Sequence, residues 1–331
     1  MPSRRRFLKL AASAIAAPAI LPSRALGATL SDKTWPDKPV HIVVPFTPGG
    51  STDITARLIG NRLADVWGQS VVIDNKPGAG GNIAADYVAH SEPDGYTIFI
   101  AGPGMSNNKF LYSHLSYDPV ADFAPVSMLI TQPNLMCVPN SLPVKTVQEF
   151  IDYCHANKGN VTFASSGTGT TLHLSGELFK RMAKVEMTHV PYRGGAPATN
   201  DLIPGRVNVI FDNLPSIIGH FRNGSVRGVA VTTRDRVPVL PEVPTIGETV
   251  PGFDVVSWFA FWVPARTPPE VVAKLNADTN AALVFPAVKS RFEDLGAVPK
   301  GSTSAELAAF LQSETAKWGP VIEDAQIKVE N

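Results

Sequence analysis

Short apolar segments alternate with stretches of helical periodicity along most of this chain. Between residues 40 and 232 each apolar segment has the length of one strand, and apolar side chains between many of them recur with the spacing of one helix face. The predicted strands are residues 40–45, 70–74, 97–102, 126–130, 135–138, 161–164, 188–190, 207–211 and 226–231. The predicted helices run from Ser51 or Thr52 to Val66 and over residues 83–90, 147–157, 172–182, 196–203 and 217–223. This alternation predicts mainly parallel sheets with right-handed crossovers, covered by helices.

The pattern changes after residue 232. Residues 233–252 are rich in proline, and the aromatic segment at residues 255–264 predicts a fully buried strand, followed by helices at residues 269–284 and 305–322. This order suggests that the chain leaves a first domain near residues 126–138 and returns to it near residues 254–263. We therefore expect an α/β fold of two hinged domains with a ligand cleft between them. The expected domains are residues 29–130 plus 254–331, and residues 131–253.

Two glycine-rich segments, residues 43–53 and 161–173, lie where a predicted strand runs into a predicted helix. The first backbone N–H groups of a helix lack partners within it, and the helix dipole makes this end an anion site. Two such turns, more than a hundred residues apart, suggest jaws that close on a molecule with acid groups at both ends.

The first turn offers Gly49 and Gly50 for close backbone approach, Phe46 as an apolar wall, and the hydroxyl groups of Ser51 and Thr52. Asp53 is expected to cap the helix or brace the loop, because a carboxylate facing an anionic ligand would repel it. Taken alone, this segment favours a tight turn that has no function.

The second turn carries hydroxyl groups interleaved with glycines: Ser165, Ser166, Gly167, Thr168, Gly169, Thr170 and Thr171. Such a loop can surround a carboxylate without introducing a fixed charge, and His173 follows directly. Neither turn contains Lys or Arg, which suits reversible capture. The alternative is a capped helix after a serine-rich loop.

Three further segments could complete the cleft. Gly80 lies in a glycine-rich stretch after the second predicted strand, and Tyr192, Gly195 and Ala196 join another strand to a helix. Asp212 ends a predicted strand and could hold an amine or hydroxyl group of a ligand, although it could equally form a turn with Asn213.

The N-terminus has the order of an export signal: Arg4, Arg5 and Arg6, then an apolar run, then small residues up to Ala28. Twin arginines favour the Tat route over a Sec signal that happens to be arginine-rich. We predict cleavage near residue 28 and localisation in the periplasm. Removal of the signal leaves 24 basic against 29 acidic residues, a balance that does not attract nucleic acid. Cys137 and Cys154 could pair in this compartment, but two separate buried thiols are the favoured interpretation.

Motifs of catalysis are missing from the sequence. The segment around Gly167 and Gly169 lacks the third glycine of a dinucleotide fingerprint, and no Gly-x-Ser-x-Gly elbow occurs. The seven histidines show no metal-ligand spacing. We therefore predict no catalytic residue, no metal and no cofactor.

Ordered blocks along nearly the whole chain resemble the periplasmic receptors of tripartite tricarboxylate transporters, often called Bug receptors. The blocks are Trp35-Pro36-Asp37-Lys38-Pro39, residues 44–50, residues 75–81, Tyr117-Asp118-Pro119, residues 122–126, residues 166–170 with His173-Leu174, residues 189–194, residues 241–245, and the strand of Trp258. The resemblance implies a type II periplasmic-binding fold and an organic acid held between the two turns, partly through water. It places Phe46, Gly49, Ser51 and Asp53 on one jaw, and Ser166, Gly169, Thr170, Tyr192, Gly195, Ala196 and Asp212 on the other. Met105 lies where relatives often carry small polar residues, so it could make the pocket more apolar.

We conclude from the sequence that this is a monomeric receptor that delivers a small carboxylate to the inner-membrane subunits of a tripartite transporter. The alternatives are a periplasmic enzyme that acts on a carboxylic acid in the same cleft, and a ligand-sensing partner of a signalling protein. The identity of the acid stays open.

Overall fold

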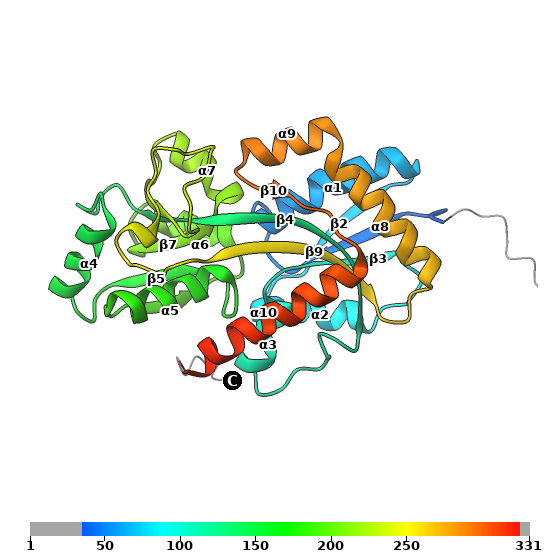
Figure 1. Cartoon of the computed structure of the whole chain (residues 1–331), viewed down its shortest axis with the longest axis horizontal. Helices are drawn as coiled ribbons and strands as arrows, with labels where there is room; N and C mark the ends of the chain where they lie inside the picture. Colours follow the sequence, from blue (N-terminus) through cyan, green and yellow to red (C-terminus); the bar gives the residue numbers. More distant parts are fainter. Residues whose placement is uncertain (1–34, 325–331) are drawn as a thin grey trace, which may run out of the picture. The chain divides into compact units, whose positions relative to one another are not determined.

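The computed structural model describes residues 35–324, so the predicted signal at residues 1–28 lies outside the described part (Figure 1). Its strands are β1 (Val40–Val44), β2 (Val71–Asn75), β3 (Thr97–Ala101), β4 (Phe123–Val138), β5 (Thr162–Ser165), β6 (Thr188–Pro191), β7 (Val209–Asn213), β8 (Arg227–Val231), β9 (Val256–Pro264) and β10 (Val298–Pro299). Its helices are α1 (Ser51–Trp67), α2 (Asn82–Ala89), α3 (Gly104–Leu111), α4 (Val147–Ala156), α5 (Thr171–Ala183), α6 (Gly195–Leu202), α7 (Leu214–Arg222), α8 (Pro269–Val284), α9 (Pro286–Asp294) and α10 (Ser304–Asp324), with short 3-10 turns at Ala79–Gly81 and Ile246–Glu248.

The strands follow one hydrogen-bonded path, β2-β1-β3-β9-β4-β7-β5-β6, while β8 and β10 pair with β4. The pairs of β1 with β2 and β3, and of β5 with β6 and β7, are parallel. Every pair that β4 makes is antiparallel. The expectation of mainly parallel sheets therefore holds at the outer strands of each half but not around the central strand β4.

Strand β4 belongs to both halves of the sheet. Its residues 123–133 pair with β9, and its residues 134–138 pair with β7 and β8. Figure 1 shows β4 and β9 running side by side between two groups of helices and strands. We call the β1–β3 side the first lobe and the β5–β7 side the second lobe; the fold is the expected α/β arrangement of two such units.

The sequence pattern predicted two strands where the structure has the single strand β4. The gap was placed at polar residues and Pro133, but Gln132 and Asn134 are buried here and bond to side chains of both lobes. Helices α3 and α9 were not predicted. Helix α3 buries Ser106, Asn107 and Asn108, so it lacks an apolar stripe that a pattern search would detect.

Each lobe has its own buried apolar cluster. In the first lobe Ile42, Ile59 and Leu63 are fully buried between the sheet and α1. In the second lobe Phe150, Phe179 and Phe211 are fully buried together. Burial of each such side chain stabilises the fold by about 1.5–3 kcal/mol, which holds the loops at the strand ends in fixed positions.

Both cysteines are free and buried. Burial raises the pKa of the Cys154 thiol to about 12, and it raises that of Cys137 well above its ordinary value. Within residues 35–324, no helix is both long enough and apolar enough to span a bilayer.

Candidate functional site

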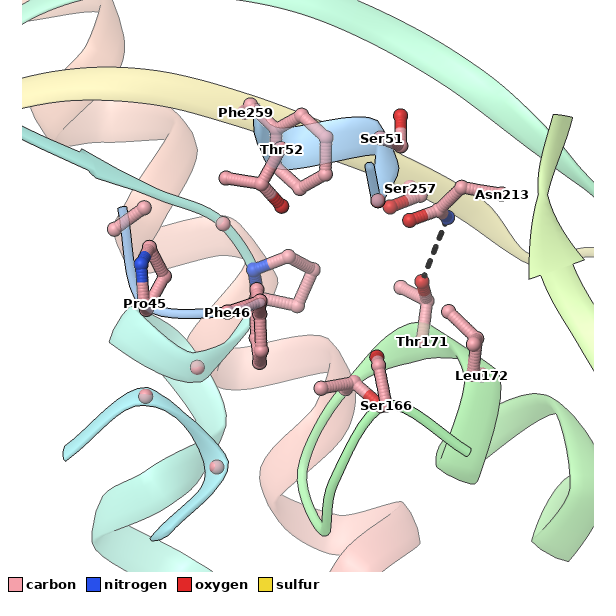
Figure 2. Close-up of a pocket in the computed structure, with 18 of the residues that line it drawn as sticks. Pro45, Phe46, Ser51, Thr52, Ser166, Thr171, Leu172, Asn213, Ser257 and Phe259 are labelled. Carbon is pink, nitrogen blue, oxygen red and sulfur yellow. Dashed lines mark hydrogen bonds between the residues drawn. The ribbon is translucent and has the colours of Figure 1, made fainter. Parts of the chain in front are cut away.

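A cavity of ≈ 50 Å³ lies between the loops that join strands to helices in the two lobes. Figure 2 shows Ser51, Thr52 and Phe259 on one side of it and Ser166, Thr171 and Leu172 on the facing side. A bound water needs at least about 10–15 Å³ of such space, so the cavity accommodates a few waters or a small molecule in their place.

Several helices begin at this cavity, among them α1, α5 and α6. Helix α1 starts after Gly50, α5 after Thr170 and α6 after Gly194, and at none of these three described ends does a capping side chain accept a hydrogen bond. The first intrahelical bonds run from Ile54 N–H to Gly50 O in α1 and from Leu174 N–H to Thr170 O in α5, both at 3.0 Å. The preceding N–H groups of each helix therefore have no intrahelical acceptor. Together they form a cluster of donors at the positive ends of three helix dipoles.

The cavity has little fixed charge. Among the described residues that line it there is no Lys, Arg or His, and Asp212 is the one carboxyl group. Asp212 is 2% exposed and accepts hydrogen bonds from Asn213 N–H at 2.8 Å and from the Thr199 hydroxyl at 3.3 Å. Burial raises the pKa of Asp212 to about 6 despite these bonds, so the carboxyl group is ionised at pH 7 and takes up a proton on mild acidification.

The hydroxyl groups at the cavity differ in whether their proton is already used in a hydrogen bond within the protein. Ser51 donates to Gln132 Oε1 at 2.7 Å, and Thr170 donates to Gly167 O at 2.7 Å. Thr171 accepts from Asn213 Nδ2 at 3.3 Å (Figure 2), so its own proton stays available. The buried Ser257 hydroxyl finds no hydrogen-bond partner among residues 35–324. Thr171 and Ser257 are thus donors that a ligand can use.

Asp53 stands behind the first turn. It receives two hydrogen bonds from Arg57, at 2.9 and 3.0 Å, and others from Gly49 N–H at 3.0 Å and Asn75 Nδ2 at 3.1 Å. Burial opposes ionisation of Asp53, but these bonds outweigh it and lower its pKa. The carboxylate therefore braces the loop, which was one of the two roles expected from the sequence.

The structure brings many of the predicted site residues to the cavity. Those that line it are Phe46, Gly50, Ser51, Gly80, Met105, Ser166, Thr170, Gly195 and Asp212. The others lie outside the lining: Gly49, Asp53, Ser165, Thr168, Gly169, His173, Tyr192 and Ala196. Tyr192, expected to cover a ligand, instead donates its hydroxyl to Asp201 at 2.8 Å.

Several of these outlying residues touch across the cleft. A methyl group at Gly49 would lie 3.6 Å from the Ala196 side chain, so the two loops are in van der Waals reach. Thr47 N–H donates to Arg193 O at 3.2 Å, and Asn107 Nδ2 donates to Gly169 O at 3.4 Å. The two lobes therefore meet directly around the cavity.

Sequence reasoning missed the lining residues that come from other elements. They include Phe99, Asn108, Tyr117, Ser257 and Phe259. Ser257 and Phe259 belong to the aromatic segment that was predicted as buried core, and nothing in its apolar pattern marks Ser257 as facing a cavity.

Known proteins resemble this chain over most of its length. The family model described as tripartite tricarboxylate transporter family receptor matches residues 55–327. Protein BugT of Bordetella pertussis is 34% identical over 307 residues, which cover 92% of this chain and 94% of BugT. The structure of R. palustris Rpa4515 with adipate has 43% identity and a TM-score of 0.87, covering 89% of this chain and 100% of that one. MatC from Rhodopseudomonas palustris with bound malate has 37% identity and a TM-score of 0.83, covering 87% and 99%.

Proposed function

This chain belongs to the tripartite tricarboxylate transporter receptor family, and we propose that it captures a small organic carboxylate in the cavity between its lobes. The observation that carries the proposal is the meeting of three helix N-termini, each without a side-chain cap, at a cavity whose described lining has no cationic side chain. Unpaired N–H and O–H donors of this kind stabilise an anion without binding it irreversibly.

The expected affinity follows from the donors. A hydrogen bond to a charged group contributes about 1.5–3 kcal/mol net, and several act at once. After the cost of immobilising the ligand, the sum is compatible with a dissociation constant of about 1 μM, or 8.2 kcal/mol. The solved relatives support a carboxylate as the ligand class, since one holds adipate and another holds malate.

We propose that the predicted residues that line the cavity contact the ligand, and that the remaining predicted residues shape the loops. We also propose domain boundaries at residues 29–130 plus 254–331 and at residues 131–253. In support, the pairing of β4 changes from β9 to β7 between Pro133 and Asn134.

The proposed export, location and transporter partner follow from the family and from the N-terminal sequence. The receptor is exported by a twin-arginine signal at residues 1–28, works as a monomer in the periplasm, and delivers its ligand to the inner-membrane subunits of a tripartite transporter. Binding closes the lobes, and the closed form is the one that the transporter recognises.

Calorimetry with adipate, malate and the neutral diamide of adipate tests the proposal. Adipate or malate should bind, whereas the diamide should not, because it lacks the charge that the helix N-termini stabilise. Combined Thr171→Val and Ser257→Ala substitutions remove the two hydroxyl donors that stay free at the cavity, and they should weaken binding by more than about tenfold while changing the melting temperature little. Equal binding of adipate and its diamide, or unchanged affinity of the double variant, would contradict the assignment.

A further inference from the structure

A largely buried polar cluster lies directly behind residues 166–170, the loop that carries Ser166 and Thr170 to the cavity. The cluster consists of Ser165 on β5, His173 on α5 and His189 on β6. Ser165 is fully buried, His173 is 3% exposed and His189 is half-buried, and none of the three lines the cavity. The proposed function leaves this cluster unexplained.

The cluster binds two backbone N–H groups of the loop. Gly167 N–H donates to Ser165 Oγ at 3.1 Å, and Gly169 N–H donates to His173 Nδ1 at 3.3 Å. Both glycines have positive φ, +131° and +89°, a backbone conformation that side-chain-bearing residues rarely adopt. Residues of the loop therefore face two ways. The N–H groups of Gly167 and Gly169 bond to the cluster, while Ser166 and Thr170 reach the cavity.

These bonds determine the protonation state of His173. Its Nδ1 accepts a hydrogen bond, so the ring is neutral with its proton on Nε2, which lies 3.9 Å from Glu177 Oε1. The ring of His189 packs against that of His173 with centroids 4.1 Å apart and planes tilted by 32°, and its Nε2 lies 2.7 Å from Ser165 Oγ. A positive charge on either ring would face the other ring.

The surroundings also disfavour charged imidazoles. Burial, then His189 and then Lys180 lower the pKa of His173 well below its ordinary value. Burial and then Lys180 lower the pKa of His189 to about 4. On α5, Glu177 is already paired with Lys180 at 2.8 Å; β5 contributes the uncharged Phe163, stacked on His189 at 4.9 Å. Both rings are therefore neutral at pH 7.

We propose that Ser165, His173 and His189 are positioning residues: as neutral acceptors they hold loop 166–170 in its binding shape without touching the ligand. The inference rests on the proposed function only where ligand affinity is measured. The shape of the loop can be tested in the protein without a ligand. A Ser–His contact of this kind also occurs in enzymes with a serine nucleophile. Such a nucleophile must face the substrate, whereas Ser165 does not line the cavity, so the positioning role explains the Ser165–His189 contact better than catalysis does.

Substitutions that keep or remove the acceptor test the proposal. In His173→Asn the side-chain Oδ1 replaces Nδ1 as an acceptor that does not titrate, and in His189→Gln the side-chain Oε1 does the same for Nε2. His173→Leu and Ser165→Ala remove an acceptor and leave Gly169 or Gly167 N–H unpaired. His155→Asn, at an exposed position on α4, is the matched control.

The first readout is amide hydrogen exchange of residues 166–170 in the full chain without ligand. His173→Leu and Ser165→Ala should accelerate this exchange by about tenfold or more, whereas His173→Asn and His155→Asn should leave it near the wild-type rate. A two-bond ¹⁵N spectrum should show His173 with its proton on Nε2. Unchanged exchange in both acceptor-removing variants, or a proton on Nδ1, would overturn the proposal.

The second readout is adipate affinity between pH 7 and pH 4. Affinity at pH 7 should fall by about tenfold in His173→Leu and be retained in the His173→Asn/His189→Gln double variant. Below pH 5 the wild type should weaken more than the double variant, and comparing the two at each pH cancels the titration of adipate itself. Parallel pH profiles would overturn the proposal. If wild type fails to bind carboxylates but the exchange results hold, the proposed function fails and the positioning role stands.

Discussion

Replacement of Gly80 by alanine should weaken ligand binding by blocking closure of the lobes. Gly80 lies in the 3-10 turn Ala79–Gly81 of the first lobe, and its φ is +61°. A methyl carbon there would lie well within 3.0 Å of the Thr168 carbonyl oxygen of the second lobe, whereas ordinary contact begins at 3.4 Å. To reach ordinary contact, the two loops would have to separate by more than half an ångström.

The expected loss of affinity follows from the hydrogen bonds that this separation lengthens. The cross-cleft bonds from Thr47 to Arg193 and from Asn107 to Gly169 are already 3.2 and 3.4 Å long. A separation of more than half an ångström carries both beyond useful hydrogen-bond length, and each bond contributes about 0.5–1.5 kcal/mol. The loss of both amounts to about 1–3 kcal/mol, a roughly 5- to 150-fold weaker affinity.

Gly68→Ala is the matched control. Gly68 ends α1 with a φ of +62°, and a methyl group there meets nothing within 4 Å. Both variants therefore carry a similar backbone strain of about 1–2 kcal/mol, which is present with or without ligand and so lowers stability but not affinity. Only Gly80→Ala adds a clash in the closed form.

Calorimetric titration with adipate, together with thermal unfolding, separates these effects. Both variants should unfold at similarly lowered temperatures, and only Gly80→Ala should bind more weakly than the wild type. If Gly80→Ala binds as tightly as Gly68→Ala, the cross-cleft contact does not limit closure and the reasoning fails.

Two further predictions concern buried polar groups: Gln132, which bonds to the cavity residue Ser51, and Asp212, which lines the cavity. Gln132→Glu should weaken adipate binding by about tenfold or more, because the new carboxylate still accepts the Ser51 proton and adds a negative charge behind Ser51. Titration calorimetry measures this change, and undiminished affinity would show that Gln132 does not influence the site. Asp212 has a folded-state pKa raised by burial to about 6, so its contribution to stability is fully present below its unfolded pKa and is lost as pH rises through 6. Asp212→Asn should abolish this loss, which amounts to about 3 kcal/mol in all at 1.36 kcal/mol per pKa unit and to about 2 kcal/mol between pH 4.5 and pH 7.5. Urea unfolding at these two pH values measures the loss, and equal pH dependence of both proteins would refute the assignment.

The local pattern predicted most of the strands and helices. Strand β1 and helix α1 follow from an apolar run, a glycine turn and a helical apolar stripe, all within residues 40–67. The missed helices lack that stripe: α9 has Val288 and Phe292 as its buried residues, and α3 buries three polar side chains. The division of β4 failed because Gln132 and Asn134 look exposed in sequence and become buried by pairing with distant partners.

The sequence by itself determined where helix N-termini follow glycine-rich turns, and the first N–H groups of a helix lack an intrahelical acceptor whatever surrounds it. It also determined that these turns carry no cation. Only the tertiary structure decided the contacts with distant residues: Ser51 donates to Gln132, Asp53 also accepts from Asn75, and Ser165 contacts His189. The reason is physical. Hydrogen-bond direction and burial depend on neighbours that lie far away in the sequence, and Ser257 became a cavity donor only when β9 crossed between the lobes.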